Sequence, residues 1–243
     1  MNPKFKVTAQ LPLAADSAED KCKILLARQP IVDKKQRLVA YELLFRAANT
    51  SFSGAPEAMH ATRTVLNNAF NTIGIATVLG TARGYINVDS RFLLSDLVIQ
   101  LPPEQVVLEI LESVDPTAEL IARVKELKKH GYSFALDDYL GDPEKIGPLI
   151  DEVDIVKVDL LGIDPARLRE ITTDLRRRHV QVIAEKVENK LAFDRTRRLG
   201  VDLFQGYYLA PPQLLTSGNE NSRSDLLLLT LPALLFDNSP TTK

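Results

Sequence analysis

The sequence predicts an α/β fold in which about eight strands close into a (β/α)8 barrel. Short β-branched runs alternate with longer segments whose apolar residues recur at helical spacing, and this alternation indicates parallel strands joined by helical crossovers. The chain has 243 residues, 45% of them apolar, which allows one sizeable core. So many strands in one domain of this length favour a closed barrel over an open doubly wound sheet.

The individual elements follow from composition and periodicity. In chain order, the predicted strands are 38–45, 84–89, 106–111, 133–138, 155–160, 181–187 and 203–209. The predicted helices between them are 57–74, 116–131, 165–179 and 191–200. Gly131 and Gly200 close two of these helices, because glycine is a common helix-stop signal.

The two ends of the chain lie outside this alternation. Residues 1–22 are mixed and polar, so we expect a flexible N-terminal arm before a barrel domain at 23–215. Residues 216–243 begin as a linker and become leucine-rich in "DLLLLTLPALLF". We expect this segment to pack against a second subunit or another domain, and folding back onto the barrel is the alternative.

Composition excludes several classes of function. The net charge is −2 and the charged residues are scattered, which gives no electrostatic footprint for DNA. Cys22 is the only cysteine, so neither an intrachain disulfide nor a thiolate metal site can form. No apolar run approaches the roughly 18 residues of a membrane span. We therefore expect a cytoplasmic protein.

Almost every predicted strand carries a polar residue at or near its C-terminal end. These residues are Glu42, Asn87, Glu109, Asp137, Asp138, Lys157, Glu185 and Gln205. In a parallel barrel the C-terminal ends of the strands converge on one mouth, where active sites of this fold are built. Any one of these residues alone would be interpreted as an ordinary strand-end polar group. Three further acidic residues, Glu112, Asp159 and Glu188, are explained as loop anchors.

The five carboxylates in this set would repel one another unless a cation balanced them. They are hard oxygen ligands without a histidine or cysteine among them, which is the chemistry of Mg²⁺ or Mn²⁺, and their number suits two ions bridged by a shared carboxylate. Two metals beside a lysine indicate attack of an activated water on a phosphodiester.

The order of motifs resembles that of EAL domains, which are bacterial phosphodiesterases and receptors for cyclic di-GMP. The matching segments are "YELLFR", "INVDS", "LEILES", "ALDDY", "DIVKVD", "AEKVEN" and "FQGYYLAPP", and the match runs from Ala27 to Pro212. The chain is most similar to the branch in which an HDOD domain follows the EAL domain. No HDOD domain follows here, so we expect either a stand-alone version or part of a longer chain.

The resemblance implies a modified TIM barrel whose first strand is antiparallel to the others. It implies that Glu42, Asn87, Glu109 and Asp137 hold one metal ion, and that Asp137, Asp138 and Glu185 hold a second. Lys157 and Gln205 would orient the water together with Glu185, while Gln29 and Arg46 would bind the nucleotide. The implied reaction converts cyclic di-GMP to linear pGpG, and the implied assembly is a homodimer.

Three departures from the family pattern keep other readings open. The family's "EAL" reads Glu42-Leu43-Leu44, the glycine of "EGVE" is Lys186, and "DDFGTG" becomes 137–142, "DDYLGD". A phosphodiesterase is the favoured reading because every metal ligand is present. The altered loop supports a second reading, a receptor that binds cyclic di-GMP with little or no turnover, and a protein-interaction module is the third.

Overall fold

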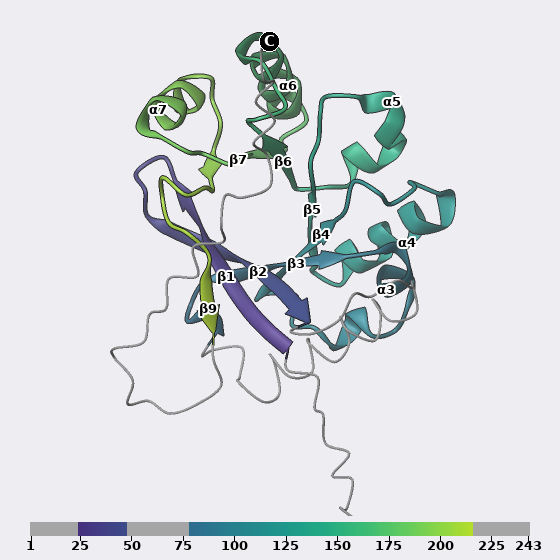
Figure 1. Cartoon of the computed structure of the whole chain (residues 1–243). Helices are drawn as coiled ribbons and strands as arrows, with labels where there is room; N and C mark the ends of the chain where they lie inside the picture. Colours follow the sequence, from purple (N-terminus) through teal and green to yellow (C-terminus); the bar gives the residue numbers. More distant parts are fainter. Residues whose placement is uncertain (1–23, 48–77, 216–243) are drawn as a thin grey trace, which may run out of the picture.

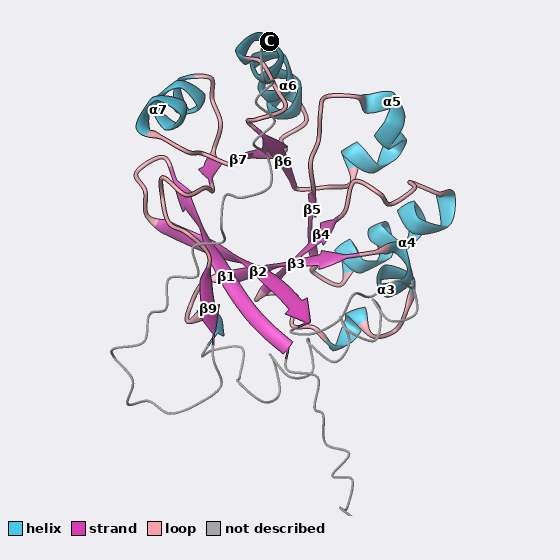
Figure 2. Cartoon of the chain, in the orientation of Figure 1, coloured by secondary structure: helices cyan, strands magenta, loops and turns pink. Residues whose placement is uncertain are grey.

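The computed structural model describes residues 24–47 and 78–215, whose strands form a closed barrel (Figures 1 and 2). The strands are β1 (Ile24–Asp33), β2 (Leu38–Ala47), β3 (Arg83–Val88), β4 (Val106–Ile110), β5 (Ser133–Leu136), β6 (Ile155–Asp159), β7 (Gln181–Glu185), β8 (Leu203–Phe204) and β9 (Gln213–Leu215). Strands β2 to β8 are parallel neighbours in chain order, and β1 closes the ring by pairing with both β2 and β8. The predicted barrel is confirmed.

Strand β1 is antiparallel to both of its neighbours in the ring, as expected from the resemblance. It continues into β2 through a turn in which Gln36 has a φ of 59° and the Asp33 carboxylate accepts hydrogen bonds from the backbone of Lys35 and Arg37. Our list of strands from the residue pattern omitted β1. Its segment lacks clear alternation and contains Pro30, which cannot donate to a ladder and is unusual inside a strand.

The helices described are α3 (Ser90–Leu94), α4 (Ala118–Lys129), α5 (Pro143–Ile146), α6 (Pro165–Arg177) and α7 (Lys190–Arg198), with 3₁₀ turns η2 (Val98–Gln100) and η3 (Gly147–Asp151). They lie outside the ring of strands (Figure 1). Thr117, Asp164 and Asn189 cap the first turns of α4, α6 and α7. These three helices match their predicted ranges to within two residues at each end, whereas the helix predicted at 57–74 lies outside the described residues.

Three predicted strands end two or more residues earlier than expected, and the one predicted at 133–138 stops at Leu136. The strand predicted at 203–209 stops at Phe204, because Gly206 takes a φ of 154° and its carbonyl accepts hydrogen bonds from Leu209 and Ala210. The strand predicted at 181–187 stops at Glu185, because Lys186 has a φ of 52°. All three ends occur at the mouth of the barrel, where the chain must leave the sheet.

The interior of the barrel contains an apolar layer that we call the inner plug. It consists of one residue from each strand of the ring: Ile31, Ala40, Tyr85, Val107, Ala135, Ile155, Ile183 and Leu203. A second, larger core joins the outer faces of the strands to the helices, and contains Val156 of β6 with Leu168 and Leu175 of α6. Burial of each such leucine contributes roughly 2 kcal/mol, so both cores hold the ring rigid around its centre.

The remaining predictions from sequence concern segments at the margin of this fold. The N-terminal arm at 1–22 and the leucine-rich segment at 216–243 lie outside the described residues. Arg46 lies in β2, and only its backbone is described. Within 24–47 and 78–215, no helix combines the length and the apolar character that crossing a bilayer requires.

Candidate active site

A layer of polar side chains, which we call the polar ring, lies directly above the inner plug. Its members are Gln29, Glu42, Asn87, Glu109, Asp137, Lys157, Glu185 and Gln205. In every parallel strand segment the polar residue comes two positions after the plug residue, and Asp137 and Gln205 thereby lie one residue past the ends of β5 and β8. Gln29 comes two positions before Ile31 because β1 runs the other way. Alternate residues of a strand face the same side of the sheet, so the ring faces the barrel interior at the C-terminal ends of the parallel strands.

Lys157 is the centre of the ring. Its side chain is 1% exposed, and its Nζ lies 2.5 Å from Glu109 Oε1 and 2.7 Å from Glu185 Oε1. The Glu42 Oε2 and Asp137 Oδ1 atoms each lie 3.4 Å from the same nitrogen. One buried ammonium therefore gathers three carboxylates from strands β2, β4 and β7 and a fourth, Asp137, from the residue after β5, and the site retains an excess of negative charge.

Burial and mutual repulsion alter the acidity of this group. Burial raises the pKa of Glu109 well above its usual value, against the opposing effect of Lys157. Burial likewise raises the pKa of Glu185 to about 7, although Lys157 again opposes the shift. Burial alone would lower the pKa of Lys157, but the surrounding carboxylates outweigh it and raise that pKa well above its usual value. The lysine thus stays charged while Glu109 and Glu185 resist ionisation.

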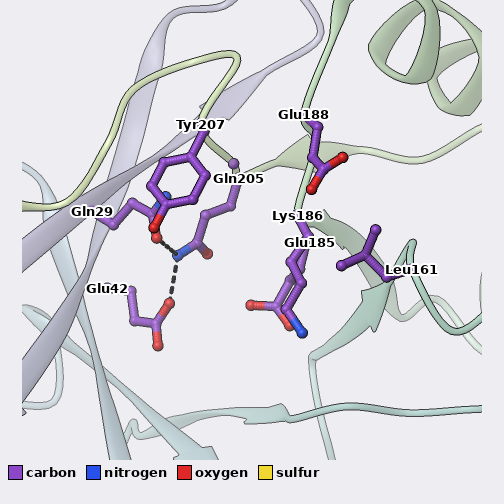
Figure 3. Close-up of a pocket in the computed structure, with 9 residues that line it drawn as sticks. Gln29, Glu42, Leu161, Glu185, Lys186, Glu188, Gln205 and Tyr207 are labelled. Atoms are coloured by element: carbon purple, nitrogen blue, oxygen red, sulfur yellow. Dashed lines mark hydrogen bonds between the residues drawn. The ribbon is translucent and has the colours of Figure 1, made fainter. Parts of the chain in front are cut away.

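Hydrogen bonds order the side of the ring formed by β1, β2 and the end of β8 (Figure 3). Gln205 Nε2 donates to Glu42 Oε2 at 2.5 Å and to Gln29 Oε1 at 3.1 Å. Gln29 in turn donates from Nε2 to the carbonyl of Ala210 at 3.2 Å. These hydrogen bonds fix the positions of the oxygen and the nitrogen of each side-chain amide.

Three buried oxygens of the ring have no hydrogen-bond partner within the described residues: Asn87 Oδ1, Glu109 Oε2 and Gln205 Oε1. Buried polar atoms are normally satisfied, so unpaired acceptors require an explanation. All three are hard oxygen acceptors next to excess negative charge, which suits a divalent cation or its coordinated solvent. The residues present therefore fit the predicted metal ions.

A second group of carboxylates lies at the rim. Oxygens of Glu112, Asp137 and Asp138 all lie within 4.8 Å of one another. Asp138 takes a φ of 44°, which aspartate tolerates better than most residues. Burial, followed by the charge of Asp137, raises the pKa of Asp138. From sequence, Glu112 is explained as a loop anchor, and no periodic signal places it here, because it lies in the loop after β4.

A pocket of about 310 Å³ opens beside the polar ring (Figure 3). It is lined by Gln29, Glu42, Leu161, Glu185, Lys186, Glu188, Gln205, Gly206 and Tyr207. Sequence reasoning assigned no site role to Leu161 or Tyr207, since an exposed leucine or tyrosine in a loop carries no distinctive pattern. Their exposed fractions, 65% and 62%, leave apolar surface at the pocket mouth.

Comparison with known proteins identifies relatives of the chain. The family model for the EAL domain matches residues 14–212. The Bacillus subtilis protein YuxH is 35% identical over 204 residues, covering 82% of this chain and 50% of YuxH. Cyclic di-GMP phosphodiesterase CdgJ of Vibrio cholerae is 36% identical over 199 residues, covering 78% of this chain and 44% of CdgJ. The chain spans about half the length of these curated relatives.

Among solved structures, the Bacillus subtilis YkuI protein, which has an EAL domain and is in complex with cyclic di-GMP and calcium, has a TM-score of 0.66 to this chain. The two are 21% identical, and the alignment covers 78% of this chain and 54% of YkuI. At this identity the likeness bears on the fold, and it agrees with the barrel described above.

Proposed function

The chain belongs to the EAL domain family, and we propose that it hydrolyses cyclic di-GMP to linear pGpG with two divalent cations, Mg²⁺ or Mn²⁺. The observation that carries the proposal is the polar ring: four carboxylates around Lys157, together with buried oxygens on Asn87 and Glu109 that have no hydrogen-bond partner in the described part of the chain. Its relative CdgJ is named a cyclic di-GMP phosphodiesterase, and the YkuI structure contains cyclic di-GMP with calcium.

We assign the metal ligands as the resemblance suggests. One ion would be held by Glu42, Asn87, Glu109 and Asp137, and the other by Asp137, Asp138 and Glu185. When bound, such cations neutralise phosphate charge and make water a stronger nucleophile. The acidic excess of the ring would favour their binding, since Lys157 balances only part of it.

The chain's own residues would position the reactants. Lys157 fixes Glu42, Glu109 and Glu185 in one array, so the geometry of the ring depends on it. Gln205 is held by its two donated hydrogen bonds, and its unpaired Oε1 can accept a hydrogen bond from a bound water. The pocket beside the ring would take part of the nucleotide, with Gln29 on its wall and Arg46 of β2 as the proposed phosphate contact.

A second candidate function is a receptor that binds cyclic di-GMP without turnover. It is favoured by the loop after Asp138, where Leu140, 58% exposed, stands at the position of the first glycine of the family's "DDFGTG". The proposed organisation is otherwise that expected from sequence: a barrel domain at 23–215, with a homodimer or docking of an HDOD domain through 216–243. Both the homodimer and the docking remain predictions.

The experiment is a product assay with purified chain, cyclic di-GMP and either Mg²⁺ or Mn²⁺, in which pGpG is followed by chromatography. We expect turnover by the unmodified chain and its loss in Asp137→Asn. Asp202→Asn is the matched control, because it removes the same charge at the N-terminal end of β8, where the carboxylate pairs with Lys34. Binding without turnover would favour the receptor, and neither binding nor turnover would contradict both functions.

A further inference from the structure

Lys186 occupies a backbone conformation that favours glycine. Its φ is 52°, in the left-handed region that residues with a side chain rarely adopt. The surrounding backbone fixes this conformation: Glu185 accepts a hydrogen bond from Leu160 N, and Val187 pairs with Gln205 and Tyr208. Glycine would fit here without strain, so the reason for a lysine must lie in its side chain.

The contact that the side chain makes does not supply that reason. Lys186 Nζ pairs with Asp159 Oδ2, joining the ends of β7 and β6. The lysine side chain is 53% exposed, and ion pairs so open to water contribute little to stability. An ammonium has three donors, and within the described residues Asp159 is the only partner of Lys186 Nζ, so two donors remain for a ligand.

The position of Lys186 gives the ammonium a distinctive role in the pocket. Of the described residues that line the pocket beside the polar ring, three are glutamates, Glu42, Glu185 and Glu188, and Lys186 is the only cation. The other nearby lysine, Lys157, is buried and engaged by four carboxylates, so it does not line this pocket. An anionic ligand entering here meets repulsion from every other charged group on the wall.

We propose that the Lys186 ammonium donates a hydrogen bond to a phosphate oxygen of the nucleotide in this pocket, and so sets affinity for the phosphodiester. The inference rests on the proposed function, because it takes a cyclic dinucleotide as the ligand. Asp159 orients the lysine, because its Oδ2 accepts a hydrogen bond from Lys186 Nζ. The other oxygen, Oδ1, accepts a hydrogen bond from Leu161 N at 2.8 Å. Lys186 is thus a binding residue that acts beside the metal ligands, and it takes no part in bond cleavage.

The test compares Lys186→Met with Lys190→Met. Both changes remove one positive charge from the same region, but Lys190 is 74% exposed, pairs with Asp194, and does not line the pocket. Binding of cyclic di-GMP is measured by calorimetry in buffer containing Ca²⁺, at several salt concentrations and with product formation checked. We expect Lys186→Met to weaken binding about tenfold or more and to reduce its salt dependence, whereas Lys190→Met binds as the unmodified chain does.

Two further variants separate binding from folding. Lys186→Gly relieves the backbone, so its thermal midpoint should match or exceed that of the unmodified chain while its binding is as weak as that of Lys186→Met. Lys186→Arg keeps the cation and should retain most of the affinity. Unchanged affinity in both Lys186→Met and Lys186→Gly would overturn the proposal and leave the proposed function intact. Absence of binding by the unmodified chain would overturn the proposed function and this inference with it.

Discussion

The inner plug and the polar ring occupy successive layers of the same barrel, yet their chemistry is opposite. Each strand of the ring contributes to both layers through residues two positions apart. The plug residues are at most 7% exposed and pack against one another. In the next layer, Glu109 and Lys157 are just as buried but carry ionisable groups. Position in the barrel therefore determines burial, and residue type together with charge pairing determines whether burial stabilises.

The difference shows how this fold divides its tasks. Burying apolar side chains contributes favourably, whereas burying charges opposes folding unless they are paired. The ring pairs its charges through a single cation, so four carboxylates depend on one lysine. The plug excludes water from below, and the ring meets solvent and ligands only through the mouth. A rigid apolar layer thus supports a layer that is not stable by itself.

The largest expected effect comes from breaking the ring at its centre. Lys157→Met should lower the free energy of unfolding by about 3–5 kcal/mol, because it leaves buried carboxylates without their cation. Ile155→Ala, two residues earlier in the same strand, should cost about 2–5 kcal/mol through the cavity it leaves in the plug. Chemical denaturation of both variants, with and without Mn²⁺, measures the costs.

Metal should reduce the stability difference from the unmodified chain in Lys157→Met but not in Ile155→Ala. A divalent cation can replace part of the missing charge in Lys157→Met, so Mn²⁺ should recover a larger share of its stability than it adds to Ile155→Ala. Equal gains in the two variants would contradict the view that the two layers are held by different forces. If, without metal, Lys157→Met and the unmodified chain have the same free energy of unfolding, the buried carboxylates do not require the lysine for stability.

A smaller effect is expected from adding metal to the unmodified chain. Binding to the folded state alone stabilises it by about 2.7 kcal/mol at a free metal concentration near 100 times Kd. Millimolar Mg²⁺ or Mn²⁺ should therefore raise the thermal midpoint, and Asp137→Asn should remove most of that rise. Asp202→Asn, at the opposite end of the barrel, should leave the rise unchanged. A midpoint indifferent to both ions would exclude the two-metal site.

Much of the ring could be predicted from sequence because its positions follow from strand periodicity. Glu42, Asn87, Glu109 and Lys157 each stand out as polar residues inside apolar runs, and parallel strands bring such positions to one end. What the pattern could not give is the pairing among them. The central place of Lys157 depends on the closure of the barrel, which no local signal encodes.

Two parts of the structure were missed for physical reasons. Strand β1 is antiparallel and contains Pro30, so the residue pattern did not distinguish it from a loop, and only the family resemblance implied an antiparallel first strand. Glu112 lies beyond β4 and follows no strand periodicity, so its approach to Asp137 and Asp138 depends on the path of a loop. Lys186 was noted as a departure, but its left-handed backbone becomes visible only in three dimensions.

The smallest expected effect concerns a carboxylate outside the barrel, where the charge is exposed to solvent. Asp164 caps α6 by accepting hydrogen bonds from Arg167 N at 3.0 Å and Ala166 N at 2.8 Å, and these contacts lower its pKa. Because the folded-state pKa is depressed, the stabilisation is complete above the ordinary pKa and is lost as pH falls through the lowered one. Asp164→Asn keeps a capping acceptor but cannot titrate, so its thermal midpoint should fall less steeply below about pH 4. If the thermal midpoints of Asp164→Asn and the unmodified chain fall equally with pH, the charge of Asp164 has no role. A flatter fall in Asp164→Asn would show that solvent-exposed backbone donors stabilise a carboxylate without a cation, which the polar ring requires.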